Sequence, residues 1–313
     1  MIDQPSVSIF IVTRLSSAER CDILRLTCEA ALAQRYRNFE VVVSENPGDF
    51  RAEDALSSIQ DERLTVVRNE EDRGFNGNIN RCLELCSYDI IKPICDDDLI
   101  HPDFLSHTVP LVDDDTLVVT GAEKYNIGCC PADMSQQAEG PFEIEIRPAG
   151  YGADIWSLNY PPFPSAMLFT RKLFSDLGRY DEASITADWD FFIEACLYHK
   201  IAYINHTLCH GGVWGGSLTE ILMDQPFFFP LGGLYTRFRV YHCKPLSAKE
   251  RRNLLRILLK EFFLQTLRPL KHPFRRTYWA GYSDYAGCFF RLWRTGKKAF
   301  AARSDVGRSQ RGI

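Results

Sequence analysis

The chain has 313 residues, 45% of them hydrophobic and 25% charged, a composition typical of a globular protein with a sizeable core. No apolar run approaches the roughly 20 residues that span a bilayer, so no membrane-spanning helix is predicted. The eleven cysteines contain no Cys-x-x-Cys pair and no histidine cluster accompanies them. This pattern argues against a structural zinc site or a disulfide framework and fits a reducing compartment.

The net charge of −5 conceals two regions of opposite charge. Residues 1–236 contain 17 basic and 37 acidic residues, a formal charge of −20, whereas residues 237–313 contain 19 basic and 4 acidic residues, a charge of +15. An acidic body with a basic tail implies an anionic surface as a partner of the tail. The first residues lack the basic start and cleavage site of a secretory signal, so a cytoplasmic location is expected.

The first hundred residues alternate between strand and helix patterns. Strands are predicted over residues 7–13, 39–46, 64–69 and 88–95. Helices are predicted over residues 18–34 and 77–86. Continuous apolar, β-branched runs are typical of buried parallel strands, and their alternation with helices predicts an α/β sheet with right-handed crossovers. In such sheets ligands bind beyond the carboxyl ends of the strands.

The second part of the chain is less regular. After a strand over 116–125, a region rich in proline and glycine extends over about 128–165. A strand leading into a helix (166–178), a helix (187–199), a strand (201–210) and a loop (211–219) are then predicted. The composition changes near residue 226, and basic, apolar helices are predicted over 249–267 and 276–293. The chain therefore divides into a body, 1–225, and a helical, basic region, 226–313.

Three consecutive aspartates, Asp96, Asp97 and Asp98, follow the strand predicted at 88–95. Carboxylates held at a strand end are ligands that Mg²⁺ or Mn²⁺ prefers, together with substrate phosphates. In an extended segment Asp96 and Asp98 point the same way and Asp97 the opposite way. The alternative is a turn followed by a helix cap. A second triplet, in "VDDDT" (112–116), is predicted to be a solvated turn.

The segment "SITADWDFFIEA" (184–195) places Asp188 and Asp190 near a predicted helix start. Acidic residues at that position complement the helix dipole and cap its amides. A carboxylate kept ionised at a helix N-terminus can also act as a general base. Taken alone, the segment leaves both interpretations open.

In their order along the chain, these segments resemble the family 2 glycosyltransferases of the GT-A fold. Five blocks carry the resemblance: "VSIFIVTR", "ALAQRYRNFEVVVSEN", "RNEEDRGFNGNINRCLE", "IIKPICDDDLIHPDFL" and "RYDEASITADWDFFIEA". They span about residues 5–220. The resemblance implies a mostly parallel central sheet with helices on both faces. It also implies a nucleotide-sugar half, about 1–100, and an acceptor half, about 101–225.

The resemblance assigns roles to individual residues. Contacts to the donor nucleotide are expected from Thr13, Arg14, Glu45, Arg73, Gly74, Asp96 and Asp97. The expected contacts of a divalent cation, Mn²⁺ or Mg²⁺, are Asp98 as the direct ligand, Asp96, and His210, although a lone histidine is more often structural. Asp188 would be the general base that deprotonates the acceptor hydroxyl. Trp214 and Ser217 would lie in a flap over the donor.

Three positions depart from the family pattern. Glu45 replaces the more usual aspartate, and Ala187 replaces the acidic residue that often precedes the base. In "QTLRP" (265–269), Pro269 stands where processive synthases have tryptophan, so a non-processive enzyme is expected.

The resemblance implies inverting transfer of a sugar from a nucleotide-diphosphate donor to a hydroxyl of a glycan or lipid-linked acceptor. Bacterial surface polysaccharides are assembled by such reactions. The alternative is an inactive sugar-nucleotide or glycan-binding module tethered to a membrane complex. The basic tail either caps the sheet or attaches the protein to the inner face of the cell membrane. Nucleic acid is not an expected partner, because the acidic body would repel it.

Overall fold

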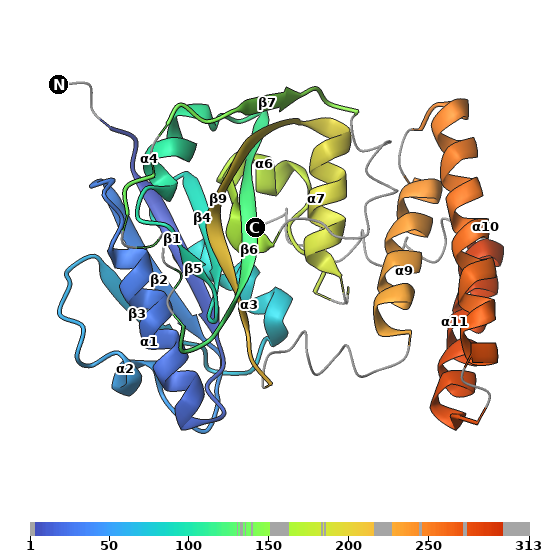
Figure 1. The fold of residues 1–313 in the computed structure, drawn as a ribbon, viewed down its shortest axis with the longest axis horizontal. Coiled ribbons are helices and arrows are strands. Elements are labelled where there is room, and N and C mark those ends of the chain that lie inside the picture. Colours follow the sequence, from blue (N-terminus) through green and yellow to red (C-terminus); the bar gives the residue numbers. More distant parts are fainter. Residues whose placement is uncertain are drawn as a thin grey trace.

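The computed structural model describes residues 4–129, 131, 134, 136–138, 140–150, 163–182, 184, 186–215, 227–243, 246–271 and 274–296. A mixed nine-stranded sheet forms the centre of the fold, and three long helices lie together at one end of the molecule (Figure 1). Ser217 and the rest of the predicted flap beyond Gly215 lie outside the described residues, as do residues 297–313.

The N-terminal half of the sheet is parallel, as predicted. Its strands are β1 (Val7–Thr13), β2 (Phe39–Glu45), β3 (Leu64–Arg68) and β4 (Ile90–Cys95). They lie in the order β3-β2-β1-β4. The connecting helices are α1 (Ala18–Leu32), the short α2 (Ala52–Ala55) and α3 (Gly74–Leu85). The α/β class is confirmed, and α3 begins three residues earlier than predicted, at a glycine with a φ of 65°.

Antiparallel pairing enters in the second half. There β8 (Met167–Thr170) pairs with β4 and with β6 (Thr116–Asn126), and β6 runs parallel to β9 (Lys200–Val213). Two strands that were not predicted, β5 (Leu99–Ile100) and β7 (Ile144–Arg147), pair antiparallel with β9. The shorter helices are α4 (Phe104–Thr108), α6 (Arg171–Asp176) and the 3-10 turns η1 (Val109–Leu111) and η3 (Pro164–Ala166).

Two hydrophobic cores cover the two faces of the sheet. Alternate residues of β1 enter opposite cores, because successive side chains of a strand point to opposite faces. Ile9 and Ile11 pack in the core that contains α1 and α4. Phe10 and Val12 pack in the core that contains α3, α6 and α7 (Ala187–Tyr198). Helices thus lie on both faces of the sheet.

The helical C-terminal region is present as a unit of three helices. These are α9 (Phe228–Cys243), which was not predicted, α10 (Ala248–Lys271) and α11 (Arg276–Thr295). They share a third hydrophobic core, and Ile193 of α7 reaches into it. Along the described stretches of the chain, no helix is long and apolar enough to cross a membrane.

The second aspartate triplet is an exposed turn, as predicted. Asp115 lies 3.2 Å from His199 Nδ1 and 3.2 Å from Lys200 Nζ, which are the residues just before and at the start of β9. The triplet therefore anchors the turn before β6 to the start of the neighbouring strand.

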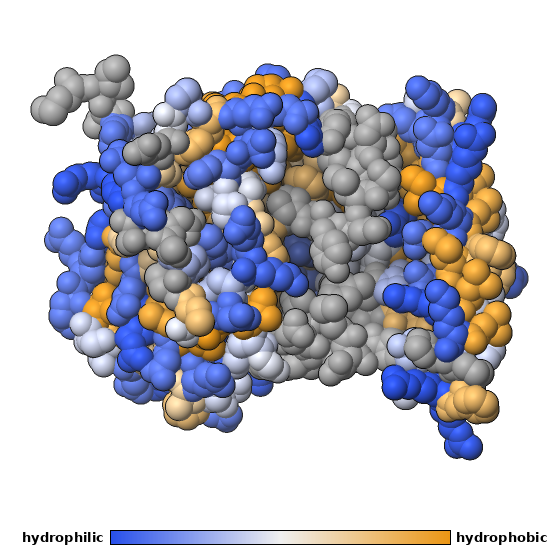
Figure 2. All heavy atoms as spheres, in the orientation of Figure 1, coloured by the Kyte–Doolittle hydropathy of each residue, from blue (hydrophilic) through white to orange (hydrophobic). Residues whose placement is uncertain are grey.

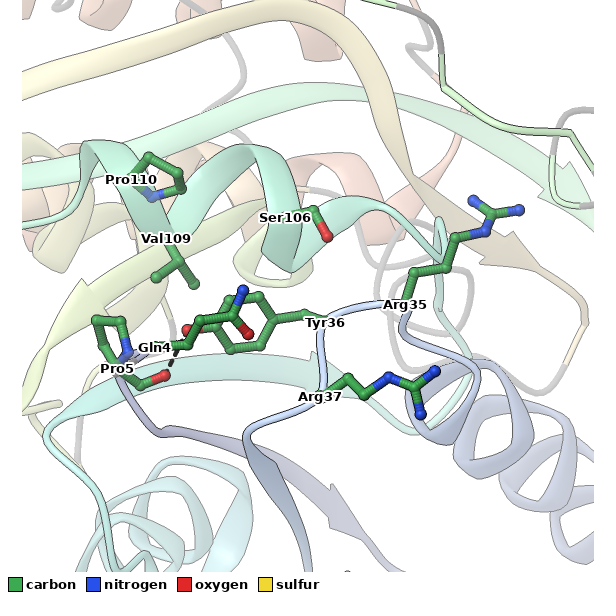
Figure 3. A pocket seen from close by; sticks show the side chains of 8 residues that line it. All are labelled: Gln4, Pro5, Arg35, Tyr36, Arg37, Ser106, Val109 and Pro110. Atoms are coloured by element: carbon green, nitrogen blue, oxygen red, sulfur yellow. Dashed lines mark hydrogen bonds between the residues drawn. The ribbon is translucent and has the colours of Figure 1, made fainter. Parts of the chain in front are cut away.

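A hollow of about 320 Å³ opens at the amino ends of β1 and β2 (Figure 3). Its lining residues are Gln4, Pro5, Arg35, Tyr36, Arg37, Ser106, Val109 and Pro110. The charge of Arg35 is already paired, because its guanidinium lies 2.5 Å from the Asp103 carboxylate. The hollow lies at the edge of the sheet opposite to Asp96–Asp98, and ligands of α/β sheets bind at the carboxyl edge.

Alanine is predicted to have opposite effects at two glycines, one in β6 where it packs on β9 and one in α11. At Gly121, where the register shifts, a Cβ would lie 2.8 Å from the His206 carbonyl oxygen, so Gly121→Ala should lower the free energy of unfolding by about 1–3 kcal/mol. A Cβ on Gly287 in α11 would have no atom within 4 Å apart from its neighbours in the chain and the backbone of its own helix, so Gly287→Ala should raise the free energy of unfolding by about 0.5–1 kcal/mol. Urea unfolding of both variants measures the difference, and equal stabilities would contradict the described packing.

Candidate functional site

The four parallel strands end at one edge of the sheet, and polar residues gather there. Thr13, Glu45 and Arg68 are the last residues of β1, β2 and β3, and Asp96 directly follows β4. Because β1 lies between β2 and β4, Thr13 is placed beside the aspartates. Its hydroxyl donates to Asp96 Oδ2 at 2.5 Å. Two of the predicted residues are thus in direct contact.

Helix α1 supplies the counterion of Asp96. Arg20, in the first turn of α1, donates from Nη2 to Asp96 Oδ2 at 2.8 Å. The backbone carbonyl of Asp96 accepts a hydrogen bond at 3.1 Å from the hydroxyl of Thr27, which lies two turns further along the same helix. Asp96 is therefore fixed at both its side chain and its backbone by the β1–α1 unit.

Asp97 faces the end of β9. Its carboxylate accepts a hydrogen bond from the indole Nε1 of Trp214 at 3.2 Å, and the Arg20 guanidinium lies 5.3 Å from the centroid of that indole ring. The Asp97 carbonyl accepts from the Tyr125 hydroxyl at 3.2 Å. A Cβ on Gly212 would lie 2.1 Å from the same carbonyl oxygen, so glycine is required there. Trp214 therefore belongs to the site, next to the expected flap.

Asp98 is the most buried of the three, with 5% of its surface exposed. One carboxylate oxygen accepts from Ser165 Oγ at 2.5 Å and the other from the Gly212 amide at 3.1 Å. Lys92, fully buried in β4, donates to the Ser165 carbonyl from behind. The side chain of Asp98 thus joins the end of β4 to η3 and to β9.

The triplet carries negative charge that its surroundings only partly neutralise. Burial raises the pKa of both Asp97 and Asp98, and the charges of the neighbouring aspartates add to the effect. Burial also lowers the pKa of Lys92 to about 8. A divalent cation would relieve this accumulation of charge, and carboxylate oxygens are the donors that Mg²⁺ and Mn²⁺ prefer.

No three His, Cys, Asp or Glu side chains in the described ranges are already arranged to hold a metal ion. His210 lies buried in β9, in register with Leu99 of β5, one residue after Asp98. The carboxylate oxygens present here nevertheless fit a cation whose coordination is completed by the substrate, because Mg²⁺ is usually held by one or two carboxylates plus substrate phosphates.

Glu45 is 1% exposed and lies in an ion pair, 2.6 Å from Arg68 Nη1. Burial raises the pKa of this carboxyl group, although the amide of Ala52 and the charge of Arg68 act against the shift. The pair holds β2 to β3 and fixes the floor of the carboxyl edge. The longer side chain in place of aspartate spans to the neighbouring strand.

Three asparagines that sequence reasoning did not assign organise the loop before α3. The Asn46 side chain accepts from the Arg73 amide at 3.2 Å and donates to the Gly74 carbonyl at 3.1 Å. Asn69 Nδ2 donates to Asn46 Oδ1 at 3.0 Å and to Asn78 Oδ1 at 2.9 Å. Arg73 and Gly74 are therefore held at the carboxyl ends of β2 and β3.

Arg14 lies apart from the aspartates. Its side chain is 62% exposed, and its guanidinium lies 3.4 Å from Asp72 and donates to the Pro47 carbonyl at 3.2 Å. Arg14 thus lies on the rim of the edge, beside the loop that carries Arg73.

Asp188 lies in the first turn of α7 and is half-buried. The amide of Trp189 donates to its Oδ1 at 2.9 Å, and burial raises its pKa to about 6. The preceding loop is tied to α3, because Asn76 Nδ2 donates to the Ser184 carbonyl at 2.7 Å. Burial raises the pKa of Tyr180 well above its usual range, and the charges of Asp188 and Cys95 add to the shift.

Several side chains of the site could not be assigned from the sequence. Arg20, Ser165 and Gly212 contact the aspartates from positions 67 to 114 residues away along the chain. Asn46 and Asn69 carried one signal, because each is the last residue of a predicted strand.

Comparison with solved structures supports the fold. Residues 1–349 of TarS from S. aureus, in complex with UDP-GlcNAc, are similar with a TM-score of 0.62 and 13% identity, over 92% of this chain and 81% of that one. A mannosyltransferase, PcManGT from Pyrobaculum calidifontis, in complex with GDP-Man and Mn²⁺, is similar with a TM-score of 0.58 and 16% identity, over 99% of this chain and 81% of that one.

A search of curated proteins finds no match to this sequence. The likeness to the two solved structures establishes the fold alone, because both sequence identities are too low to show a shared activity. The sequence itself matches a family over the β1 to α6 segment. Residues 8–178, more than half of the chain, match Glycosyl transferase family 2, and the chain belongs to that family.

Proposed function

We propose that this glycosyltransferase moves one sugar, with inversion, from a nucleotide-diphosphate donor to a hydroxyl of a glycan or lipid-linked acceptor. The observation that carries the proposal is the pair of acidic sites in one fold. Asp96–Asp98 lie at the carboxyl edge of β4, and Asp188 lies at the start of α7, whose preceding loop is hydrogen-bonded to α3 of the donor half.

The donor half is assigned to the edge formed by β1–β4. Two structurally similar proteins bind UDP-GlcNAc and GDP-Man, which supports a nucleotide sugar as the donor class. Thr13, Asp96 and Asp97 would border the ribose and diphosphate, while Arg73 and Gly74 would border the base. Glu45 would support these contacts through its ion pair with Arg68, which joins the ends of β2 and β3. Arg14 lies on the exposed rim.

A divalent cation is assigned to the Asp96–Asp98 turn, with Asp98 as the direct ligand expected from the family resemblance. Each oxygen of Asp98 accepts one protein hydrogen bond, which leaves a second lone pair on each. His210 would assist from β9. When bound, such a cation stabilises negative charge on the leaving diphosphate. PcManGT, a similar structure, is in complex with Mn²⁺.

Asp188 is assigned as the general base. Its carboxylate accepts the proton of the acceptor hydroxyl while the hydroxyl oxygen forms a bond to the anomeric carbon. The bond from that carbon to the diphosphate oxygen breaks in the same step, and the nucleoside diphosphate leaves. One displacement inverts the configuration at the anomeric carbon. A pKa of about 6 keeps the base ionised at neutral pH and basic enough to accept a proton.

The C-terminal unit is assigned as a peripheral contact with an anionic membrane, which would present a lipid-linked acceptor at the cytoplasmic face. We define its apolar face as the exposed residues Leu259, Phe263, Leu264, Leu267, Leu270, Phe274, Trp279, Phe290 and Trp293. Hydrophobic side chains are visible at the surface over α10 and α11 in Figure 2. Exposed basic residues are interleaved with them: Arg256, Lys260, Arg268, Lys271, Arg275, Arg276, Arg291 and Arg294.

This combination favours a lipid surface over a second copy of the chain. Exposed aromatic side chains beside basic ones suit an interface where apolar groups enter the lipid and cations meet anionic headgroups. Two copies of the apolar face would bring the basic residues of both together. An inactive binding module is not favoured, because the family is one of transferases and the acidic residues of both sites are present.

Asp188→Asn should lower the release of nucleoside diphosphate from sugar nucleotides by about 10²–10⁴-fold, because no carboxylate remains to accept the proton. A panel that includes UDP-GlcNAc and GDP-Man supplies the donor. In the unmutated enzyme kcat should fall as the pH drops through about 6, since the base is then protonated. A folded Asp188→Asn variant with unchanged rates would show that another group accepts the proton.

Removal of divalent cations by a chelator should abolish transfer, and Mn²⁺ should restore it. Asp98→Asn should raise the Mn²⁺ concentration for half-maximal activity by about 10–100-fold, because a ligand or its support is lost. Asp114→Asn, in the exposed second triplet, is the matched control and should behave like the unmutated enzyme. Equal Mn²⁺ affinity of both variants would remove Asp98 from the cation site.

The full chain should co-sediment with vesicles of phosphatidylglycerol more than with neutral phosphatidylcholine vesicles, and less at high salt. Replacing Phe263 and Phe290 together with serine should weaken this binding at least about tenfold, since burial of one phenylalanine contributes about 1.5–3 kcal/mol. Phe50→Ser, at an exposed position distant in sequence from the unit, is the control. Unchanged binding of the double variant, or a dimer in solution that buries this face, would contradict the assignment.

A further inference from the structure

The first turn of α7 contains a buried carboxylate that the proposed reaction does not use. Asp190 lies two residues after Asp188 and is 5% exposed. Its oxygens accept hydrogen bonds from Ser184 Oγ at 2.9 Å and from Thr236 Oγ1 at 2.5 Å. The Arg239 guanidinium lies 3.4 Å from Asp190 Oδ2. A buried charge is stable only when it is paired and hydrogen-bonded, and here every requirement is met.

Two of these partners come from α9, outside the segment that matches the family. Arg239 also lies 3.4 Å from Glu194, which is buried one turn further along α7. Residues four apart lie on the same face of a helix, so Arg239 contacts Asp190 and Glu194 side by side. Helix α9 therefore binds the first two turns of α7 through one guanidinium and one hydroxyl.

Backbone packing brings α9 equally close to the residue before α7. A Cβ on Gly232 would lie 2.3 Å from Cγ2 of Thr186, the N-cap position of α7. The hydroxyls of Thr186 and Thr236 are 3.2 Å apart. The α9 backbone is thus in van der Waals contact with the start of the helix that carries Asp188.

Asp188 has no comparable side-chain support among the described residues: the hydrogen bond to its carboxylate comes from the amide of Trp189 in its own helix. Its position therefore follows the position of the first turn of α7. We propose that Thr236 and Arg239 are positioning residues, which act through Asp190 to hold Asp188 against the acceptor hydroxyl. The inference rests on the proposed role of Asp188 as the base.

This makes α9 a part of the catalytic unit. A displacement of a reacting group by about 1 Å can cost about 10²-fold in rate. The donor edge is built by β1–β4 and α3, which α9 does not need to support. A loosened first turn of α7 should thus impair the chemical step and leave donor binding unchanged.

Thr236→Val removes the hydroxyl while it keeps the shape of the side chain, and kcat for nucleoside diphosphate release should fall about tenfold or more. The KM for the sugar nucleotide, and the binding of UDP or GDP with Mn²⁺ by calorimetry, should stay unchanged. Thr236→Ser should restore most of kcat. Thr266→Val is the matched control, because Thr266 bonds to Phe262 and Tyr282 within α10 and α11, and its kcat should equal that of the unmutated enzyme.

Arg239→Gln is a second test of the same separation of kcat from nucleotide binding. Because Asp190 then loses the ion pair that ties α7 to α9, kcat should fall while the binding of UDP or GDP with Mn²⁺ stays unchanged. A folded Thr236→Val enzyme with unchanged kcat would overturn the positioning role. So would equal losses of kcat and nucleotide binding.

The outcomes also separate this inference from the proposed function. If Asp188→Asn is inactive while Thr236→Val and Arg239→Gln retain full kcat, the base assignment stands and the positioning role is overturned. If Asp188→Asn retains full activity, the base assignment fails first. Circular dichroism of each variant confirms that the compared proteins are folded.

Discussion

Desolvation of carboxylates is the constraint on which the arrangement of this molecule depends. A buried carboxylate costs several kcal/mol unless donors surround it, so each one forces particular segments together. Asp98 brings Ser165 and Gly212 to the end of β4 across 67 and 114 positions of the chain. Asp96 does the same for β1 and α1. The carboxylates that give the carboxyl edge its negative charge therefore also hold together the segments that surround it.

Buried carboxylates also join elements elsewhere in the fold. Glu45 ties β2 to β3 through Arg68, and Asp190 ties α7 to α9 through Thr236 and Arg239. The division of the chain at about residue 225 is thus a division in composition, since polar contacts cross it between α9 and α7, the helix that contains Asp188. The helical, basic region beyond that point is therefore packed against α7 of the body.

The strands β1–β4 could be predicted because their residues are apolar on both faces, and the aspartates because they follow such a strand. The strands β5 and β7 have two and four residues, too few to show a period. Helix α9 was missed because Pro230, Gly232 and Gly233 are poor helix formers, and packing on α7 outweighs that preference. Arg20, Ser165 and Gly212 could not be assigned, because their contacts depend on tertiary structure rather than on local spacing.

The order of synthesis gives the contact between α7 and α9 a further consequence. Ribosomes produce the sheet and α7 before α9, and domains generally begin to fold from the N-terminal side. Until Thr236 and Arg239 emerge, Asp190 lacks two of its three partners and the first turn of α7 lacks its clamp. A nascent or truncated chain that ends before α9 would thus contain the Asp96–Asp98 turn with its partners, but a first turn of α7 without the contacts of Thr236 and Arg239.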